Sequence, residues 1–268
     1  MKLFNQPKKE PASPSMPTRS AEENSIESIF DLAAKDPSYR PRFYELLLSD
    51  NLVAIGGGEP ARPSGEYQGG DTINVYPLSD GRTPIFTSIA RIFDSGIVKG
   101  EVKYFEMKGR DLLRIISNNV AVINPFSECS KELTVSEMRR LLEGSWSLKV
   151  EPFAVGEVEG QIVPTSYPNE ATEALTNLFI RRPAVLRSYF GMIKYREGDT
   201  LSQGHSFLGI EVEGNLESIR RESAEVLRAV LPDEPMFDIL DMKAPLGEQI
   251  SAKMQPFYQR DAESRRLQ

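Results

Sequence analysis

The sequence predicts an α+β protein of two domains, each an antiparallel or mixed sheet with packed helices. Three observations support this prediction. The chain has 268 residues, enough for two domains of ordinary size. Apolar residues make up 40% of it and charged residues 26%, close to a globular average. Short apolar runs typical of strands lie between segments whose apolar residues have helical spacing.

The first domain, expected over residues 24–144, begins with helices. Apolar residues at helical spacing predict a helix from 26 to 33, with Asn24 as N-cap and Glu27 completing a capping box. Pro41 starts a second helix, and a short buried strand at Leu52–Ile55 ends in three glycines. The later elements are expected as a hairpin over 73–86, a helix over 88–95 with Phe93 facing inward, strands at 102–106 and 120–123, and a helix over 112–116 between them.

The helix that closes the first domain has the clearest signals in the chain. Thr134 is the expected N-cap, Glu137 completes a capping box, and Gly144 ends the helix. The domain boundary is placed at Ser145–Lys149.

The second domain is expected over residues 150–260. Its predicted order is strand, helix, strand, strand, helix, strand, helix, which is a ferredoxin-like split βαβ order with a terminal helix added. One of its strands, Ser206–Val212, alternates as a half-buried strand does. The predicted segments are strand 155–163, helix 171–179, strands 185–195 and 206–212, helix 216–230, strand 236–242 and helix 247–254.

Composition and charge exclude several classes of function. The chain has one Cys and one His, so it forms no internal disulfide and offers too few ligands for a Cys/His zinc cluster. A net charge of −7 argues against nucleic acid as a partner. No apolar run is long enough for a signal peptide or a membrane span, so we expect a cytoplasmic protein that does not bind membranes. Residues 1–23, rich in proline, are expected to form a disordered tail.

No catalytic constellation is found in the sequence. The three glycines after the first strand lack the Lys of a phosphate loop, and Glu59 follows them. Cys129 has acidic neighbours, which suit an ordinary thiol, and His205 has no nucleophile-elbow motif around it. We therefore expect no enzyme activity, no metal and no cofactor. One alternative stays open, an enzyme that uses Glu211 with Asp238, which a separation above about 10 Å would exclude.

Three groups of residues are candidates for binding a protein partner. The first is a corner between a strand end and a helix start, where backbone N–H groups lack helical partners. The second is a strand-end loop with its adjacent exposed face, and the third is an aromatic pair near the end of the chain that could anchor a partner. Each group also has a plainer interpretation as a structural turn or a solvated face. The residues are Phe86, Thr87, Ser88 and Arg91 in the first group, His205, Glu211 and Glu213 in the second, and Phe257 and Tyr258 in the third.

Several segments together resemble a known family. They are residues 84–88, 175–179 with 183–193, 207–216, 231–235 and 256–260. In this order and spacing the chain resembles the bacterial enhanced-serine-sensitivity protein B (SseB) family, from about Asn24 to Arg260 and through both domains. The resemblance implies a cytosolic protein, without an assigned catalytic residue set, that is linked to serine sensitivity alongside a sulfurtransferase.

We therefore expect a non-enzymatic interaction or accessory protein in serine sensitivity and sulfur amino-acid physiology. A sulfurtransferase is one expected partner. The alternative is a secretion-associated or toxin-immunity-type binding module, whose partner is a secreted toxin or a secretion component; the acidic charge would suit a basic partner. The sequence leaves open the identity of the partner, the oligomeric state and whether a small metabolite binds.

Overall fold

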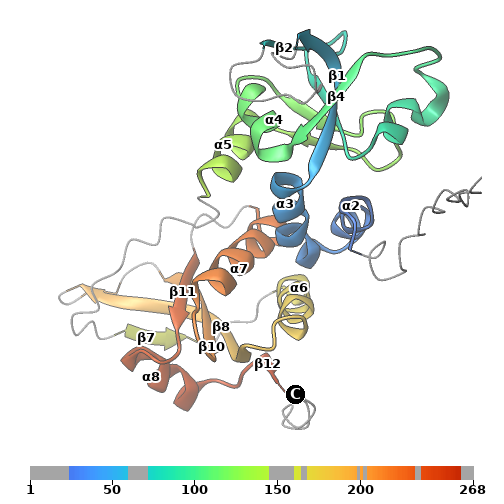
Figure 1. The fold of residues 1–268 in the computed structure, drawn as a ribbon. Coiled ribbons are helices and arrows are strands. Elements are labelled where there is room, and N and C mark those ends of the chain that lie inside the picture. Colours follow the sequence, from blue (N-terminus) through green and yellow to red (C-terminus); the bar gives the residue numbers. More distant parts are fainter. Residues whose placement is uncertain are drawn as a thin grey trace, which may run out of the picture.

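The computed structural model describes residues 24–59, 72–144, 160–163, 168–197, 200–201, 204–232 and 237–260. The predicted tail, the predicted boundary at 145–149 and residues 155–159 of a predicted strand lie outside these ranges. Within them, each half of the chain builds its own six-stranded sheet with packed helices, which confirms the two-domain α+β class (Figure 1).

Two helices open the first domain. Helix α2 (Ile26–Lys35) begins at Ile26 as expected, but its N-cap is Ser25 and not Asn24, because the Ser25 side chain accepts the backbone N–H of Ser28. A 3-10 turn, η1 (Pro37–Tyr39), leads into α3 (Arg40–Ser49), which has Pro41 in its first turn as predicted.

The sheet of the first domain is centred on β1. Its strands are β1 (Asn51–Glu59), β2 (Thr72–Val75), β3 (Thr83–Phe86), β4 (Tyr104–Lys108), β5 (Ala121–Ile123) and β6 (Lys131–Leu133). Its remaining helices are the 3-10 helix η2 (Ile89–Gly96), α4 (Gly109–Ile115) and α5 (Val135–Glu143). The sheet is mixed, with β3 parallel to β5 and the other pairs antiparallel. The predicted hairpin is wrong, because β2 and β3 each pair with β1.

The three glycines do not end β1 as predicted but lie inside it, paired with β2. A Cβ atom at Gly56 would lie 2.1 Å from the Asn74 carbonyl oxygen, so the close approach of β2 requires glycine there.

The two faces of this sheet are covered differently. Leu52 and Ala54 point inward to a core shared with α2, α3, α4 and α5. Val53 points to the other face, where Phe86 and Ile92 cover it. Phe93 was expected to face inward, but its side chain is 43% exposed, because η2 is a kinked 3-10 helix and not a regular α-helix.

The second domain contains the predicted elements in the predicted order. They are β7 (Gly160–Val163), α6 (Asn169–Ile180), β8 (Val185–Glu197), β10 (His205–Val212), α7 (Glu217–Val230), β11 (Phe237–Asp241) and α8 (Pro245–Lys253). Two short strands, β9 (Thr200–Leu201) and β12 (Tyr258–Gln259), were not predicted. The pairing in space differs from a split βαβ unit, since β11 lies directly beside β10 in parallel and no strand separates them. β8 occupies the other side of β10, in antiparallel orientation.

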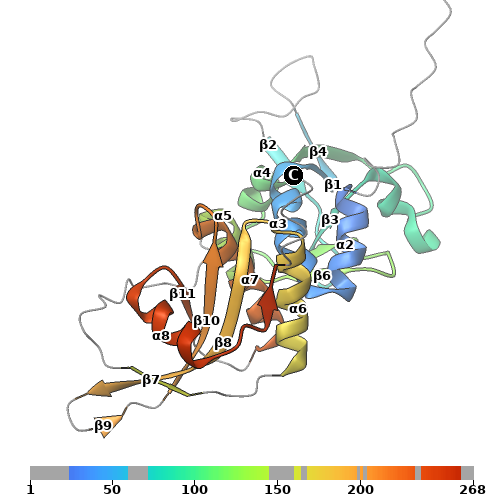
Figure 2. The same cartoon turned by 90° about the horizontal axis from the view of Figure 1, so that it is seen from below.

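β10 is buried on both faces and not half-buried as expected. Leu208 and Ile210 pack in the core with α6 and α7, whereas Phe207 packs on the opposite face near α8 (Figure 2). The strand therefore lies in the middle layer of a three-layer domain, which explains why apolar residues occupy both of its faces.

The two domains meet through helices. η1 contacts α6 and α7, and α3 contacts α7 (Figure 1). The Arg181 guanidinium lies 4.0 Å from the Tyr39 ring centroid and donates to the Ser38 hydroxyl at 2.6 Å. Arg140 of α5 also pairs with the buried Glu225 of α7 at 3.8 Å. These polar contacts fix the interface at two separate points.

Candidate functional site

The predicted corner forms a polar network around Glu27 of α2. The Ser88 and Thr87 hydroxyls donate to Glu27 Oε1 at 2.6 and 3.2 Å, and Arg91 Nε lies 3.2 Å from the same oxygen. Burial acts to raise the pKa of Glu27, but the hydrogen bonds from Ser88 and Arg91 outweigh it and lower that pKa overall. The charged carboxylate therefore holds this corner together.

The backbone donor expected at the corner has an internal acceptor. The Thr87 N–H donates to Asn124 Oδ1 at 2.9 Å, and Asn124 adopts a positive φ of 48° that aims its amide group. Phe86 is fully buried. The structure thus brings Thr87, Ser88 and Arg91 together, but they surround the Glu27 carboxylate of the same chain.

The second predicted group is spread along β10. His205 lies at the start of the strand, and Glu211 near its end pairs with Arg187 at 2.7 Å. Glu213 beyond the strand lies 3.4 Å from Arg260. The three side chains do not form one site, because β10 separates His205 from the two carboxylates.

The predicted aromatic pair packs against the rest of its own domain. The Phe179 ring lies 6.3 Å from the Phe257 ring and 5.5 Å from the Tyr258 ring, between centroids. The Tyr258 hydroxyl donates to the Phe179 carbonyl at 3.3 Å. Both aromatic side chains remain partly exposed, and their contacts hold residues 257 and 258 against α6.

The pair of carboxylates considered for catalysis is too widely spaced. In the β10–β11 register Asp238 lies opposite Phe207, four residues before Glu211. This offset corresponds to about 13 Å along the strands. It exceeds the roughly 5–9.5 Å used by paired carboxylates in glycosidases, so the structure removes this alternative.

Cys129 has the environment of an ordinary thiol. It is half-buried, and burial together with nearby Asp31 raises its pKa. A raised pKa lowers the thiolate fraction and hence the reactivity. In the described part of the chain, no group of three or more His, Cys, Asp or Glu residues is placed to hold a metal ion. None of the helices in that same part has the length and apolar character needed to cross a membrane.

A row of side chains on the outer face of the first sheet was missed by the sequence reasoning. Tyr104 of β4 lies opposite Ile55 of β1, and the backbone of Tyr76 bonds to Ile55 from the other side. Tyr76 is 51% exposed and Tyr104 42%. We call Tyr76, Ile55 and Tyr104 the tyrosine row. The alternation along β1 could have shown which face Ile55 takes, but not the pairing that aligns the tyrosines.

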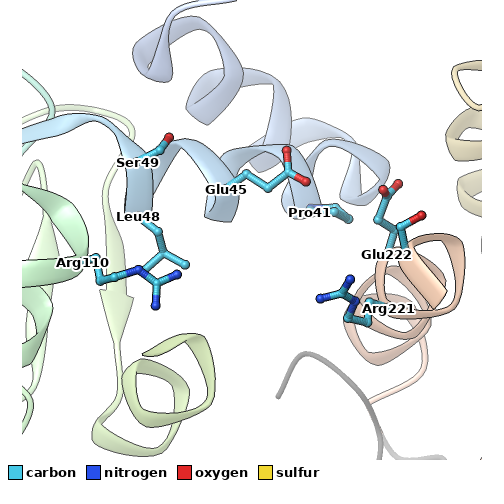
Figure 3. Close-up of a pocket in the computed structure, with 8 residues that line it drawn as sticks. Pro41, Glu45, Leu48, Ser49, Arg110, Arg221 and Glu222 are labelled. Atoms are coloured by element: carbon cyan, nitrogen blue, oxygen red, sulfur yellow. The ribbon is translucent and has the colours of Figure 1, made fainter. Parts of the chain in front are cut away.

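A cavity between the domains was also missed. It has a volume of about 330 Å³ and lies among α3, the start of α4 and α7 (Figure 3). Its lining residues are Pro41, Glu45, Leu48, Ser49, Arg110, Ser218, Arg221 and Glu222. These residues come from three segments that are distant in the sequence, so no local motif predicts the cavity.

Comparisons with known proteins place the chain in a family. Residues 27–140 match the SseB protein N-terminal domain, and residues 162–260 match the SseB protein C-terminal domain. The chain is 26% identical over 246 residues to Protein SseB of Escherichia coli (strain K12), which covers 88% of this chain and 92% of that protein. Protein SseB of Shigella flexneri matches with the same identity and coverage. No solved structure matches significantly.

Proposed function

We propose that this chain, which belongs to the SseB family, is a non-enzymatic accessory protein of the cytosol that binds a protein partner in serine and sulfur amino-acid physiology. The observation that carries the binding role is the tyrosine row. Two half-exposed aromatic side chains flank a β-branched residue on a rigid sheet, and tyrosine is enriched in the core of protein interfaces.

The geometry of the row suits recognition of a protein. Tyr104 is held by the β1–β4 ladder, and Tyr76 is held by a backbone hydrogen bond of 2.9 Å to Ile55. Tyrosine supplies a large contact area with few rotatable bonds, so fixing it on binding costs little entropy. The Gly57 position beside the row carries no side chain, and a Cβ there would have its nearest neighbours 3.9 Å away. Those neighbours are Lys103 Cδ and the Tyr76 hydroxyl, which border the row at this position.

The polar corner around Glu27 favours a structural role over a catalytic one. A nucleophilic hydroxyl needs a base that can take its proton. Ser88 instead donates to a carboxylate whose pKa is lowered despite its partial burial, because Ser88 and Arg91 bond to it. Such a carboxylate is a weak base, and Arg91 competes for it at 3.2 Å.

Affinity purification with crosslinking tests the proposal. The full chain and a Tyr76→Ser/Tyr104→Ser variant are expressed in the native cell and compared by quantitative mass spectrometry. Ile180→Ser is the control, because Ile180 is 67% exposed on α6 in the other domain. We expect one partner to be recovered in stoichiometric amount with the wild type and the control, and to be lost with the tyrosine variant.

The identity of that partner decides between the two physiological settings. A sulfurtransferase or an enzyme of serine metabolism supports the accessory role. A secreted toxin or a secretion component would replace it by the immunity-type alternative, which the charge of −7 would suit. Equal recovery with the tyrosine variant, or turnover of a small metabolite by the purified chain, would contradict the proposal.

A further inference from the structure

The cavity between the domains has the size and lining of a small-molecule site. Its volume of about 330 Å³ is at the lower end of the range of ligand pockets, roughly 300–1,000 Å³. Pro41 and Leu48, both buried, give it an apolar part. Ser49 and Ser218 add hydroxyl groups. A polar ligand with a short apolar portion matches this mixture.

The charges in the lining are balanced and separated. Arg110 and Arg221 extend from opposite sides toward the open space, one from each domain (Figure 3). Glu45 and Glu222 lie together on the side of Pro41, away from the two guanidinium groups. The lining thus presents one cationic and one anionic region, with two residues of each sign.

Both carboxylates of the anionic region are paired with an arginine outside the cavity lining. Glu222 is bound by Arg182 at 2.6 Å, and Glu45 by Arg42 at 3.0 Å. The pKa of Glu222 is nevertheless raised, first by burial and in part by the neighbouring charge of Glu45, although Arg182 and Arg221 act to lower it. A ligand cation placed between the two carboxylates would relieve this repulsion.

The cationic region also has capacity for a ligand. Arg221 is exposed, and the contact of its Nε with Glu217 is long, at 4.0 Å. Arg110 donates to the Leu142 carbonyl at 3.4 Å, near the limit of a hydrogen bond. Because these contacts are weak, both guanidinium groups can reorient to bind the carboxylate of a ligand. The planar guanidinium group can donate two parallel hydrogen bonds to a carboxylate.

We propose that this cavity binds a free α-amino acid. Its carboxylate would lie against Arg110 and Arg221, and its ammonium group against Glu45 and Glu222. A zwitterion matches both regions, whereas a phosphate would face the two carboxylates and a polyamine the two guanidinium groups. Because the ligand would contact both domains, binding would stabilise their arrangement and raise the melting temperature by mass action.

Isothermal titration calorimetry on the full chain tests the proposal with defined probes. Each of the common L-amino acids is titrated, together with propionate, ethylammonium and inorganic phosphate at the same concentrations. We expect saturable one-to-one binding of at least one amino acid. Propionate and ethylammonium, which each carry half of the charge pattern of alanine, should bind at least about tenfold more weakly than that amino acid.

Substitutions locate the binding. Arg221→Ala and Glu45→Gln should each weaken it by about tenfold or more, because each removes one charged partner. Arg114→Ala is the matched control. It lies on the same helix as Arg110 but is 60% exposed, pairs with Asp111 and does not line the cavity. Unchanged melting temperatures of the unliganded variants show that each has folded.

Three results would overturn the proposal. The first is no binding of any amino acid up to about 10 mM. The second is binding that Arg221→Ala and Glu45→Gln leave unchanged. The third is phosphate or propionate binding as tightly as the amino acid, which would make the cavity an anion site.

Discussion

The contact of Arg181 with the first domain predicts that one substitution will weaken the association of the two domains. Arg181 is the C-cap of α6, and its guanidinium reaches η1. There it donates to Ser38, which is 3% exposed, and covers the Tyr39 ring at 4.0 Å. Arg181→Ala removes both contacts and leaves the Ser38 hydroxyl buried.

The size of the effect follows from the two contacts. A hydrogen bond from a charged donor contributes about 1.5–3 kcal/mol to stability, and a cation over an aromatic ring about 0.5–2 kcal/mol. Because the two contacts share one side chain, their sum is not strictly additive. We expect Arg181→Ala to lower the free energy of unfolding by about 2–4 kcal/mol. Arg181→Lys should recover less than half of this loss, because Lys lacks the planar group that covers the ring.

Urea unfolding followed by circular dichroism measures the loss. Hydrogen exchange with mass spectrometry shows whether η1 and α6 lose protection together. Arg187→Ala is the control, because its pair with Glu211 is in the same domain, its side chain is 45% exposed, and the pair should contribute about 1 kcal/mol or less. If Arg181→Ala costs no more than Arg187→Ala, the contact does not join the domains and the reasoning fails.

Three further predictions concern the strand, a cap and the response to pH. Gly56→Ala should destabilise the first domain by several kcal/mol, roughly the cost of strain in a packed core. Gly57→Ala should be tolerated, because the atoms nearest to a Cβ there lie 3.9 Å away. The melting temperatures of the two variants test this difference. Thr134→Ala should cost about 1 kcal/mol in urea unfolding, because the Thr134 hydroxyl accepts an N–H of α5, and an unchanged midpoint would contradict this. Burial raises the pKa of Glu225, so in the folded protein this carboxyl keeps its proton at pH values where the unfolded chain, with a pKa of 4.5, has lost it. The stability of the protein should therefore rise as the pH falls through the folded-state pKa toward 4.5. Glu225→Gln should lack this gain. The pKa of Glu27 is lowered, so its carboxylate contributes stability that is present above pH 4.5 and is lost as the pH falls below that value; Glu27→Gln should remove this contribution. Equal pH profiles of stability for the two variants would refute these opposite pKa shifts.

Local signals in the sequence predicted the elements that local physics determines. The Thr134 cap and the Gly144 end of α5 are confirmed, since Thr134 accepts the expected N–H and Gly144 adopts a left-handed conformation. The second half of the capping box is not seen. Glu137 instead accepts the Tyr44 hydroxyl at 2.5 Å and pairs with Lys131 at 3.0 Å. A tertiary contact has therefore replaced the local one.

Features that depend on pairing between distant strands could not be predicted from local patterns in the sequence. Glycines usually signal a turn, so β1 was expected to end at Gly56. The register with Val75 shows a different reason for the glycine, the close approach of a neighbouring strand. The cavity could not be predicted for a similar reason, because Glu45, Arg110 and Glu222 come together only when the two domains pack. The resemblance to the family covers both domains, but it could not place these side chains.

The cavity and the tyrosine row lie close along the chain but on different sides of the first sheet. Ser49 lines the cavity at the end of α3, and β1 begins at Asn51 and presents Ile55 in the row. α3 packs on the inner face, whereas Ile55 belongs to the outer cluster. Coupling between two sites requires an element with two arrangements that both sites bias. β1 is paired on both edges, with β3 and β4, and so offers no second arrangement. We therefore expect the affinity for the protein partner to change less than about twofold when the amino acid saturates the cavity. A larger change would show that the two domains themselves move as the switching element.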